Sequence, residues 1–330
     1  MEPRLRLIAR HEMWPLSRPF RISRGVKSAA DVVVAEVAAR GKSGRGECVP
    51  YARYGDSSAS VLAQIEAARA ALEAGVTRED LQALLPPGAA RNALDCALWD
   101  LEAKQAGISV ADRLGVRLAP IATAVTVSLD APERMHEAAR AIADAPLIKV
   151  KVSADAPLAA VDAVRRAAPS ARLIVDPNEG WSPDVLLSAL PRLADFGVAL
   201  IEQPVPASDD DVLDGLAPPV PICADEAAHT RADLDRVARR YQAVNVKLDK
   251  AGGLTEALAM AADVRARGLQ LMIGCMVSTS LSIAPALMLA HDADFVDLDG
   301  PWWLSQDRPD AMRFADGVLT PPCAGWGYPA

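Results

Sequence analysis

Short apolar segments alternate with longer amphipathic stretches along most of the chain after residue 120. The spacing between successive apolar segments leaves room for one helix, which is typical of parallel strands joined by crossover helices. There are eight such segments, and eight strands are the number that closes a barrel. The predicted strands are 123–128, 147–152, 172–175, 199–201, 221–223, 243–246, 270–273 and 295–298.

The first 115 residues follow a different, mixed pattern. Extended segments at 5–11 and 31–38 are followed by helical stretches at 57–74 and 89–106. The turn-rich segment 41–46, which holds three glycines, is predicted to be a hairpin connection. This mixture indicates a smaller α+β unit ahead of the barrel.

The two patterns predict an α/β protein of two parts. No low-complexity linker separates them, so we expect an α+β domain at 1–115 to pack on a barrel at 116–311. The tail 312–330, rich in Pro, Gly and Trp, is expected to fold back. The alternative, a doubly wound open sheet, would need a Gly-rich dinucleotide loop after an early strand, and the sequence has none.

The amino-acid composition limits the kinds of binding partner that we expect. The chain of 330 residues has 43 acidic and 35 basic residues and a net charge of -8. This balance argues against nucleic acid as a partner, and it provides no positive field for an anionic membrane. We therefore expect a small-molecule substrate and leave open a homo-oligomer.

The chain also has no predicted targeting or spanning segment. Residues 1–6 are not followed by the apolar stretch of a signal peptide, and residues 281–290, interrupted by Pro285, are typical of a buried helix. Scattered cysteines without metal-type spacing favour free thiols in a reducing cytoplasm. They are Cys48, Cys96, Cys223, Cys275 and Cys323.

Three carboxylates mark the ends of successive predicted strands. Asp176 and Glu202 close the third and fourth strands, and Asp225 follows the fifth. In a barrel this repeat brings the three side chains together at the C-terminal mouth. Any one of them alone would be explained by a helix cap. Three converging carboxylates require a cation between them, and oxygen ligands without His or Cys favour Mg²⁺.

Three lysines point to acid–base chemistry at the same mouth. Lys149 and Lys151 alternate on the second strand and face the same side, and Lys247 ends the sixth strand on the opposite side of a barrel. Crowded ammonium groups beside a metal are expected to lower the pKa of at least one lysine. Lys250 is predicted to be solvated or to start a helix.

These groups would solve one chemical problem. A hydrogen next to a carboxylate is very weakly acidic, so its removal needs strong electrostatic stabilisation of the resulting enolate, which a metal and ammonium groups supply. Bases on opposite sides can remove a proton from one face of a carbon and return it to the other.

At these residues the chain resembles the enolase superfamily, muconate-lactonising subgroup. The resemblance covers essentially the whole chain and implies an N-terminal α+β capping domain and a modified (β/α)7β barrel. It implies one Mg²⁺ on Asp176, Glu202 and Asp225, and an acid/base pair of Lys151 and Lys247. Lys149 is implied to tune Lys151 and to contact the substrate carboxylate. The matching segments are Lys149-Val150-Lys151, Asp176-Pro177-Asn178, Glu202-Gln203-Pro204, Asp225-Glu226 and Asn245-Val246-Lys247.

Two further segments resemble those of dipeptide epimerases. Asp297 and Asp299 on the last strand match an Asp-x-Asp that holds the ammonium group of a dipeptide, and segment 20–27 resembles the mobile capping loop. Arg24 is the matching candidate for the side-chain carboxylate of glutamate, with Arg21 or Lys27 as alternatives. The resemblance thus implies Mg-dependent epimerisation of a dipeptide such as L-Ala-L/D-Glu.

Other functions stay open. Within the superfamily they are o-succinylbenzoate synthase, N-acylamino-acid racemase and muconate cycloisomerase, whose substrates have no free ammonium group. A Schiff-base aldolase would use Lys151 or Lys247 as a nucleophile and need no metal. A third alternative is a binding protein with a relic metal site.

Overall fold

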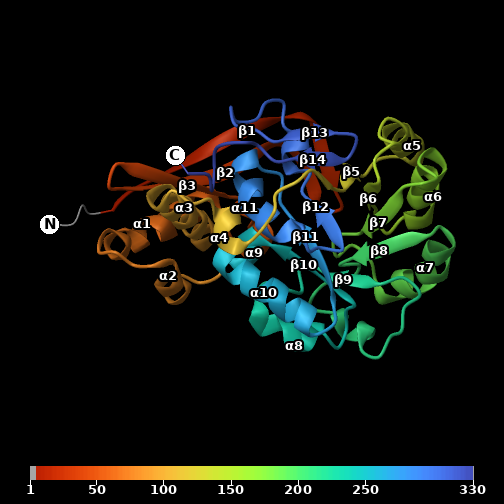
Figure 1. Cartoon of the computed structure of the whole chain (residues 1–330). Coiled ribbons are helices and arrows are strands. Elements are labelled where there is room, and N and C mark those ends of the chain that lie inside the picture. The colour runs from red at the N-terminus through yellow and green to blue at the C-terminus, as the bar shows by residue number, and fades with distance from the viewer. Residues whose placement is uncertain (1–4, 330) are drawn as a thin grey trace.

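The computed structural model describes residues 5–329, so the prediction about the chain start lies partly outside the described residues. Eight parallel strands form one sheet in the order β12-β11-β10-β9-β8-β7-β6-β5 (Figure 1). The two end strands are joined by a hydrogen bond of 2.8 Å from Ala124 N to Val296 O, which closes the barrel. The strands are β5 (Val125–Val127), β6 (Leu147–Lys151), β7 (Arg172–Asp176), β8 (Val198–Glu202), β9 (Ile222–Ala224), β10 (Ala243–Lys247), β11 (Gln270–Gly274) and β12 (Phe295–Asp297).

Helices follow most of these strands and cover the outside of the barrel (Figure 1). The α/β barrel fold is confirmed, and each predicted strand overlaps an observed one. The buried helix expected at 281–290 is α11. The helices are α5 (Pro132–Arg140), α6 (Pro157–Ala167), α7 (Pro183–Asp195), α8 (Leu234–Val237), α9 (Leu248–Ala251), α10 (Leu254–Ala266) and α11 (Ser280–Ala290), with 3-10 turns η2 (Asp210–Leu213), η3 (Arg231–Asp233) and η4 (Gly300–Trp303).

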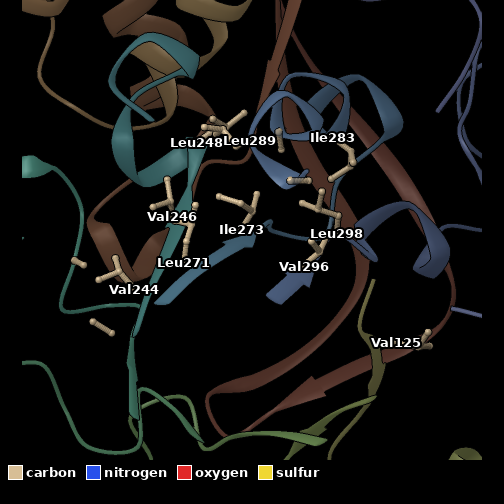
Figure 2. Packing of buried hydrophobic residues seen from close by; sticks show 14 of the residues in the cluster. Val125, Val244, Val246, Leu248, Leu271, Ile273, Ile283, Leu289, Val296 and Leu298 are labelled. Carbon is tan, nitrogen blue, oxygen red and sulfur yellow. The ribbon is translucent and has the colours of Figure 1, made fainter. Parts of the chain in front are cut away.

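Strand alternation separates the apolar core from the polar interior of the mouth. On β10, Val244 and Val246 belong to the large core between barrel and helices. The residues between and after them, Asn245 and Lys247, reach acidic side chains at the ends of β8 and β9. Figure 2 shows Val246 of β10 and its pairing partner Ile273 of β11 side by side among these core residues. Burial of these apolar faces fixes the strand register and thereby the direction of every polar side chain on the strands.

The N-terminal region is an antiparallel sheet covered by helices. Its strands are β1 (Arg6–Ile22), β2 (Gly25–Ala39) and β3 (Lys42–Cys48), and its helices are α1 (Ser58–Glu73), α2 (Arg78–Leu84), α3 (Ala89–Ala106) and α4 (Val110–Leu114), with the 3-10 turn η1 (Ala52–Tyr54). A second apolar core lies between sheet and helices. The extended and helical segments expected here are confirmed.

The hairpin predicted at 41–46 is confirmed, but its turn is shorter, because β2 and β3 pair antiparallel up to Ala39 and Lys42. Only its start is a turn, and the rest is strand β3, which packs against α3. A Cβ atom at Gly44 would lie 2.2 Å from Ala97 O, and one at Gly46 would lie 2.1 Å from Ala93 O. The glycines are therefore required for the close approach of strand and helix.

The C-terminal tail runs back to the N-terminal region. Strand β13 (Arg313–Ala315) pairs with β14 (Val318–Thr320), and β14 pairs with β4 (Ile121–Ala122), just ahead of the barrel. Further on, Trp326 Nε1 donates a hydrogen bond to Cys96 O at 2.9 Å, and Gly327 N donates one to Asp100 Oδ1 at 2.7 Å. Within residues 5–329, no helix combines the length and the apolar character that crossing a bilayer requires.

Candidate active site

A cavity of about 500 Å³ lies at the carboxyl ends of the barrel strands, between the barrel and the N-terminal region. Active sites of barrel enzymes occupy this end. The barrel supplies charged side chains from four of its strands or the loops after them, and the N-terminal region supplies two loops, 20–27 and 51–54. Lining residues include Phe20, Ile22, Arg24, Val26, Lys27, Tyr51, Arg53, Tyr54, Lys149, Lys151, Asn178, Asp225, Glu226, Lys247, Asp297 and Asp299.

The three predicted strand-end carboxylates lie at this mouth, fully buried. Asp176 and Glu202 are the last residues of β7 and β8, and Asp225 directly follows β9; their exposures are 1%, 0% and 2%. Lys149 Nζ lies 3.0 Å from Asp176 Oδ2 and 2.6 Å from Glu202 Oε2. The buried carboxylates are thus neutralised by ammonium groups, as buried charges must be.

Asp176, Glu202 and Asp225 are the candidate ligands of a metal ion. Among residues 5–329, no three His, Cys, Asp or Glu side chains are arranged to hold one ion. The chemistry of the three carboxylates nevertheless fits a hard divalent cation, because all three present oxygen and Lys149 already shows a cation between two of them. Glu202 Oε2, although close to Lys149 Nζ, has no partner in hydrogen-bond geometry within the described chain.

Lys151 and Lys247 approach from opposite walls. Lys151 ends β6 and Lys247 ends β10, which are four strands apart in either direction around the eight-stranded barrel. Each is paired with a different carboxylate: Lys151 Nζ lies 2.5 Å from Asp176 Oδ2, and Lys247 Nζ lies 2.6 Å from Asp225 Oδ2. Both ammonium groups face the cavity.

The facing carboxylates determine the direction of the pKa shift of two buried lysines. Burial lowers the pKa of Lys149 and of Lys247, but the facing acids outweigh it and the net shift of each pKa is upward. For Lys149 these acids are Asp297, Glu202 and Asp176. Among the carboxylates, burial and the neighbouring Asp176 raise the pKa of Glu202 to about 7. The predicted lowering of a lysine pKa concerned Lys149 and Lys151 beside a bound metal ion, so it stays a prediction.

The prediction that Lys250 is solvated is wrong, whereas its alternative, a place at the start of a helix, agrees with the position of Lys250 in the short helix α9. Its side chain is buried in α9 at 1% exposure, and Nζ donates to Asp225 Oδ1 at 2.7 Å and to Asn245 O at 2.9 Å. Nζ also donates to the backbone oxygen of Asp225. The sequence places Lys250 shortly after a strand. It does not reveal that the helical turn α9 directs this side chain back to Asp225.

The last strand places two aspartates in the cavity wall with different partners. Asp297 Oδ2 accepts a hydrogen bond from Lys149 Nζ at 2.8 Å, whereas its Oδ1 is buried without a partner in the described chain. Asp299 Oδ2 accepts hydrogen bonds from Thr126 N at 2.8 Å and Trp303 Nε1 at 3.3 Å. Burial and the adjacent Asp297 raise the pKa of Asp299 to about 6.

The hairpin between β1 and β2 brings Arg24 over the mouth. Arg24 Nη2 donates to Glu226 Oε1 at 2.7 Å and to Tyr51 OH at 3.1 Å, and Nη1 donates to Asn178 O at 2.7 Å. Burial lowers the pKa of Arg24, but Glu226 outweighs it and the net pKa shift is upward. Lys27 also lines the cavity, whereas Arg21 is not among the lining residues.

A second arginine joins the two loops of the N-terminal region to the barrel. Arg53 forms a two-pronged contact with Glu179, at 2.8 Å from Nε to Oε2 and 2.9 Å from Nη2 to Oε1. Arg24 Nη1 reaches the same carboxylate at 3.3 Å. Glu179 itself is fixed by the backbone of the next loop, where Ala207 N donates to its Oε1.

Gln203 is a residue that sequence reasoning gave no role. It is fully buried with a positive φ of 34°, and its Oε1 accepts from Asp225 N and Ala227 N, both at 2.9 Å. Its Nε2 donates to Tyr241 OH at 2.9 Å. The side chain therefore ties the end of β8 to the loop that holds Asp225. Only its place beside Glu202 in the sequence could have drawn attention to it.

Comparison with known proteins agrees with this architecture. Residues 4–115 match the N-terminal domain of mandelate racemase / muconate lactonizing enzyme, and residues 133–329 match the enolase C-terminal domain-like family. Among solved structures, an enolase family member from Agrobacterium tumefaciens with bound sodium and L-Ala-L-Glu has a TM-score of 0.94 and 45% identity, covering 96% of this chain and 98% of that one. A dipeptide epimerase from Enterococcus faecalis with Mg and L-Leu-L-Tyr has a TM-score of 0.90 and 27% identity, covering 99% of both chains.

Two curated relatives are enzymes that act on amino acid derivatives. The chain is 50% identical over 311 residues to an L-Ala-D/L-Glu epimerase of Escherichia coli, covering 93% of this chain and 97% of the relative. It is 43% identical over 294 residues to an N-acetyl-D-glutamate racemase of Pseudoalteromonas, covering 88% and 93%. The chain belongs to the mandelate racemase / muconate lactonizing enzyme family of the enolase superfamily.

Proposed function

We propose that this chain epimerises the α-carbon of the C-terminal residue of a dipeptide, with L-Ala-L/D-Glu as the substrate that its cavity fits best. The observation that carries the proposal is the placement of Lys151 and Lys247 on opposed strands facing one cavity. Residues 1–115 would act as the capping domain of a catalytic barrel at 116–311, with the tail 312–330 packed back. The 50% identical epimerase supports the reaction and the substrate.

Asp176, Glu202 and Asp225 would hold one Mg²⁺. When bound, the ion supplies positive charge to the substrate carboxylate and so stabilises the electron pair left by deprotonation. Lys149 would support this role from the protein side, because its ammonium group is buried among the same acids. The related dipeptide epimerase that contains Mg and a dipeptide supports a magnesium site here.

The two lysines would exchange roles with the direction of reaction. One amine in its neutral form removes the α-hydrogen from its face, and the opposite ammonium delivers a proton to the other face, so the configuration inverts. Before the reaction, Lys151 and Lys247 are held by Asp176 and Asp225 respectively. This positioning fixes each nitrogen on its own wall of the cavity.

The remaining polar groups would select the dipeptide. The ammonium group of the first residue would bind between Asp297 and Asp299, where Asp297 Oδ1 lacks a partner in the described chain. Arg24 would bind the side-chain carboxylate of a C-terminal glutamate. Its hydrogen bond to Glu226 would then be replaced by one to the substrate. Both interactions are charge-assisted hydrogen bonds.

Racemisation of an N-acyl amino acid is a second candidate, favoured by the 43% identity to an N-acetyl-D-glutamate racemase. An acylated substrate has no ammonium group to compensate two buried aspartates, and it would leave Asp297 Oδ1 unpaired. The geometry therefore favours the dipeptide.

The test is a panel of L,L-dipeptides and N-acetyl amino acids in deuterated water with Mg²⁺, analysed by mass and by chiral chromatography. We expect one deuterium at the α-carbon of the C-terminal residue and formation of its epimer, fastest with L-Ala-L-Glu. No exchange with any dipeptide would refute the proposal. Metal-independent trapping of substrate by borohydride would indicate the Schiff-base alternative.

A further inference from the structure

Trp303 joins the aspartate pair of the last strand to the hairpin that covers the cavity. The residue ends η4 and is buried at 1% exposure. Its indole Nε1 donates to Asp299 Oδ2 at 3.3 Å, and its ring meets Phe20 edge-to-face at a centroid distance of 4.7 Å. Phe20 lines the cavity near the base of the hairpin. One side chain thus contacts a wall of the site and its cover.

The backbone around Trp303 also anchors the hairpin. Ser17 Oγ donates to Trp303 O at 3.1 Å, Leu16 forms a β-bridge with Leu304, and Ser305 N donates to Pro15 O at 2.9 Å. The pairing of β1 with β2 is irregular between Pro15 and Phe20. This stretch of β1 instead bonds to the segment 303–305 at the end of η4 and after it.

Asp299 is held so that one oxygen is fully engaged. Both of its hydrogen bonds, from Thr126 N and Trp303 Nε1, end on Oδ2. The main-chain donor and the indole fix the plane of the carboxylate, and a carboxylate oxygen with two donors is oriented as well as stabilised in its charged form. The same two hydrogen bonds therefore also fix the direction of the other oxygen, Oδ1.

We propose that Trp303 is a positioning residue for recognition of the free ammonium group, and that it couples this recognition to the seating of the hairpin through Phe20. The inference rests on the proposed function. Because the indole N–H acts only through Asp299, its contribution should be confined to ligands that carry an ammonium group. A purely structural tryptophan would affect all ligands alike.

The test uses a pair of ligands that differ only in this group. Binding of L-Ala-L-Glu and of N-propionyl-L-glutamate, which lacks the amine, is measured with Mg²⁺ by competition in the exchange assay and by calorimetry. Trp303→Phe keeps a ring against Phe20 and removes the N–H. We expect the preference for the dipeptide over the propionyl compound to fall about tenfold, as for loss of one hydrogen bond to a charged group.

The neighbouring tryptophan is the matched control. Trp302 lies against Arg18, at 3.9 Å from the guanidinium carbon to the ring centroid, and its ring meets Trp303 edge-to-face at a centroid distance of 5.4 Å. Within the described chain its indole donates no hydrogen bond to Asp299, unlike that of Trp303. Trp302→Phe should leave the ligand preference unchanged. If Trp303→Phe fails to fold by circular dichroism, Trp303→His, which keeps an N–H donor, is measured instead and should retain most of the preference.

An equal loss of affinity for both ligands in Trp303→Phe, or an unchanged preference, would overturn the inference. So would a His variant in which the preference falls as far as in an Asp299→Asn variant. Failure of the proposed function looks different, because the wild-type protein would then bind neither ligand in preference and exchange no α-hydrogen.

Discussion

The barrel side and the capping side of the cavity are built in different ways. On the barrel side, the ionised groups lie on the strands or directly after them and are almost completely buried, such as Lys149, whose side chain is 3% exposed. On the capping side, they lie on loops and are partly open to solvent, with side-chain exposures of 27% for Arg24 and 44% for Arg53. The barrel strands therefore hold the groups proposed for the reaction and for the substrate ammonium group, and the loops hold the arginine proposed to choose the substrate side chain.

The largest effect on activity is expected from the replacement of a barrel lysine. Lys151→Met or Lys247→Met keeps the length of the side chain but removes one proton carrier, and kcat for epimerisation should fall by at least about 10³-fold. Each variant should still exchange the α-hydrogen of one of the two substrate epimers, and the two variants should differ in which one. Chiral chromatography with mass detection measures both. Loss of both exchanges together would argue against one lysine on each face.

Metal removal tests the barrel side as a whole. Chelation should abolish turnover, and added Mg²⁺ should restore it, because three acids and a charged substrate otherwise face one another. Asp225→Asn should raise the Mg²⁺ concentration for half-maximal activity at least tenfold, which a magnesium titration followed by turnover and by thermal unfolding can measure. Full activity in the presence of a chelator would contradict the role of the three carboxylates.

On the capping side we expect a change in specificity with the chemistry retained. Arg24→Met should lower kcat/KM for L-Ala-L-Glu about 30-fold, as for loss of a charge pair, and that for L-Ala-L-Ala less than about threefold. Arg21→Met is the matched control, since Arg21 belongs to the same hairpin but is not among the residues lining the cavity. Equal losses on both substrates would place Arg24 in the reaction itself.

The smallest effect on activity is expected where the two sides meet. Asp249 in α9 accepts hydrogen bonds from Val49 N at 3.0 Å and Asn92 Nδ2 at 2.8 Å, and burial raises its pKa to about 7 from 3.8. The folded protein thus binds this proton more tightly than the unfolded chain. Its stabilising contribution is complete below about pH 4 and is lost as the pH rises through about 7.

Asp249→Asn keeps an acceptor and removes the charge, so the variant should gain stability relative to the wild-type protein as the pH increases from 4 to 8, by up to a few kcal/mol. Glu47 and Asp56 act in the same direction on Asp249 and are left in place. Thermal unfolding at pH 5 and pH 8 measures the difference. A difference independent of pH would show that Asp249 is ionised in both states.

The barrel side was also the part that the sequence predicted well. Strand ends follow from apolar runs, and an acid after each run has one possible place in a parallel barrel, so Asp176, Glu202 and Asp225 could be located together. Contacts made through a reversal of the chain were not predicted. The helical turn that returns Lys250 to Asp225, the positive φ of Gln203 and the packing of Gly44 on α3 depend on the tertiary fold.

The capping side was predicted only through resemblance. Nothing in segment 20–27 distinguishes Arg24 from Arg21, because both are basic residues of one loop, and only the folded hairpin directs Arg24 to Glu226. Trp303 had no recognisable role, because the ring contact with Phe20 joins the two ends of the chain, although Asp299 lies only four residues before it. Long-range contacts of this kind leave no periodic pattern in a sequence.

The central claim is that Lys151 and Lys247 act on opposite faces of one carbon, and the hydrogen carried by the first product molecules tests it most directly. The wild-type protein is supplied with L-Ala-L-Glu in deuterated water, and the epimer formed at low conversion is analysed by mass. We expect deuterium at the α-carbon of essentially every product molecule, because the lysine that delivers the proton is not the lysine that removed the hydrogen. A substantial fraction of product that retains the substrate's own hydrogen would contradict it.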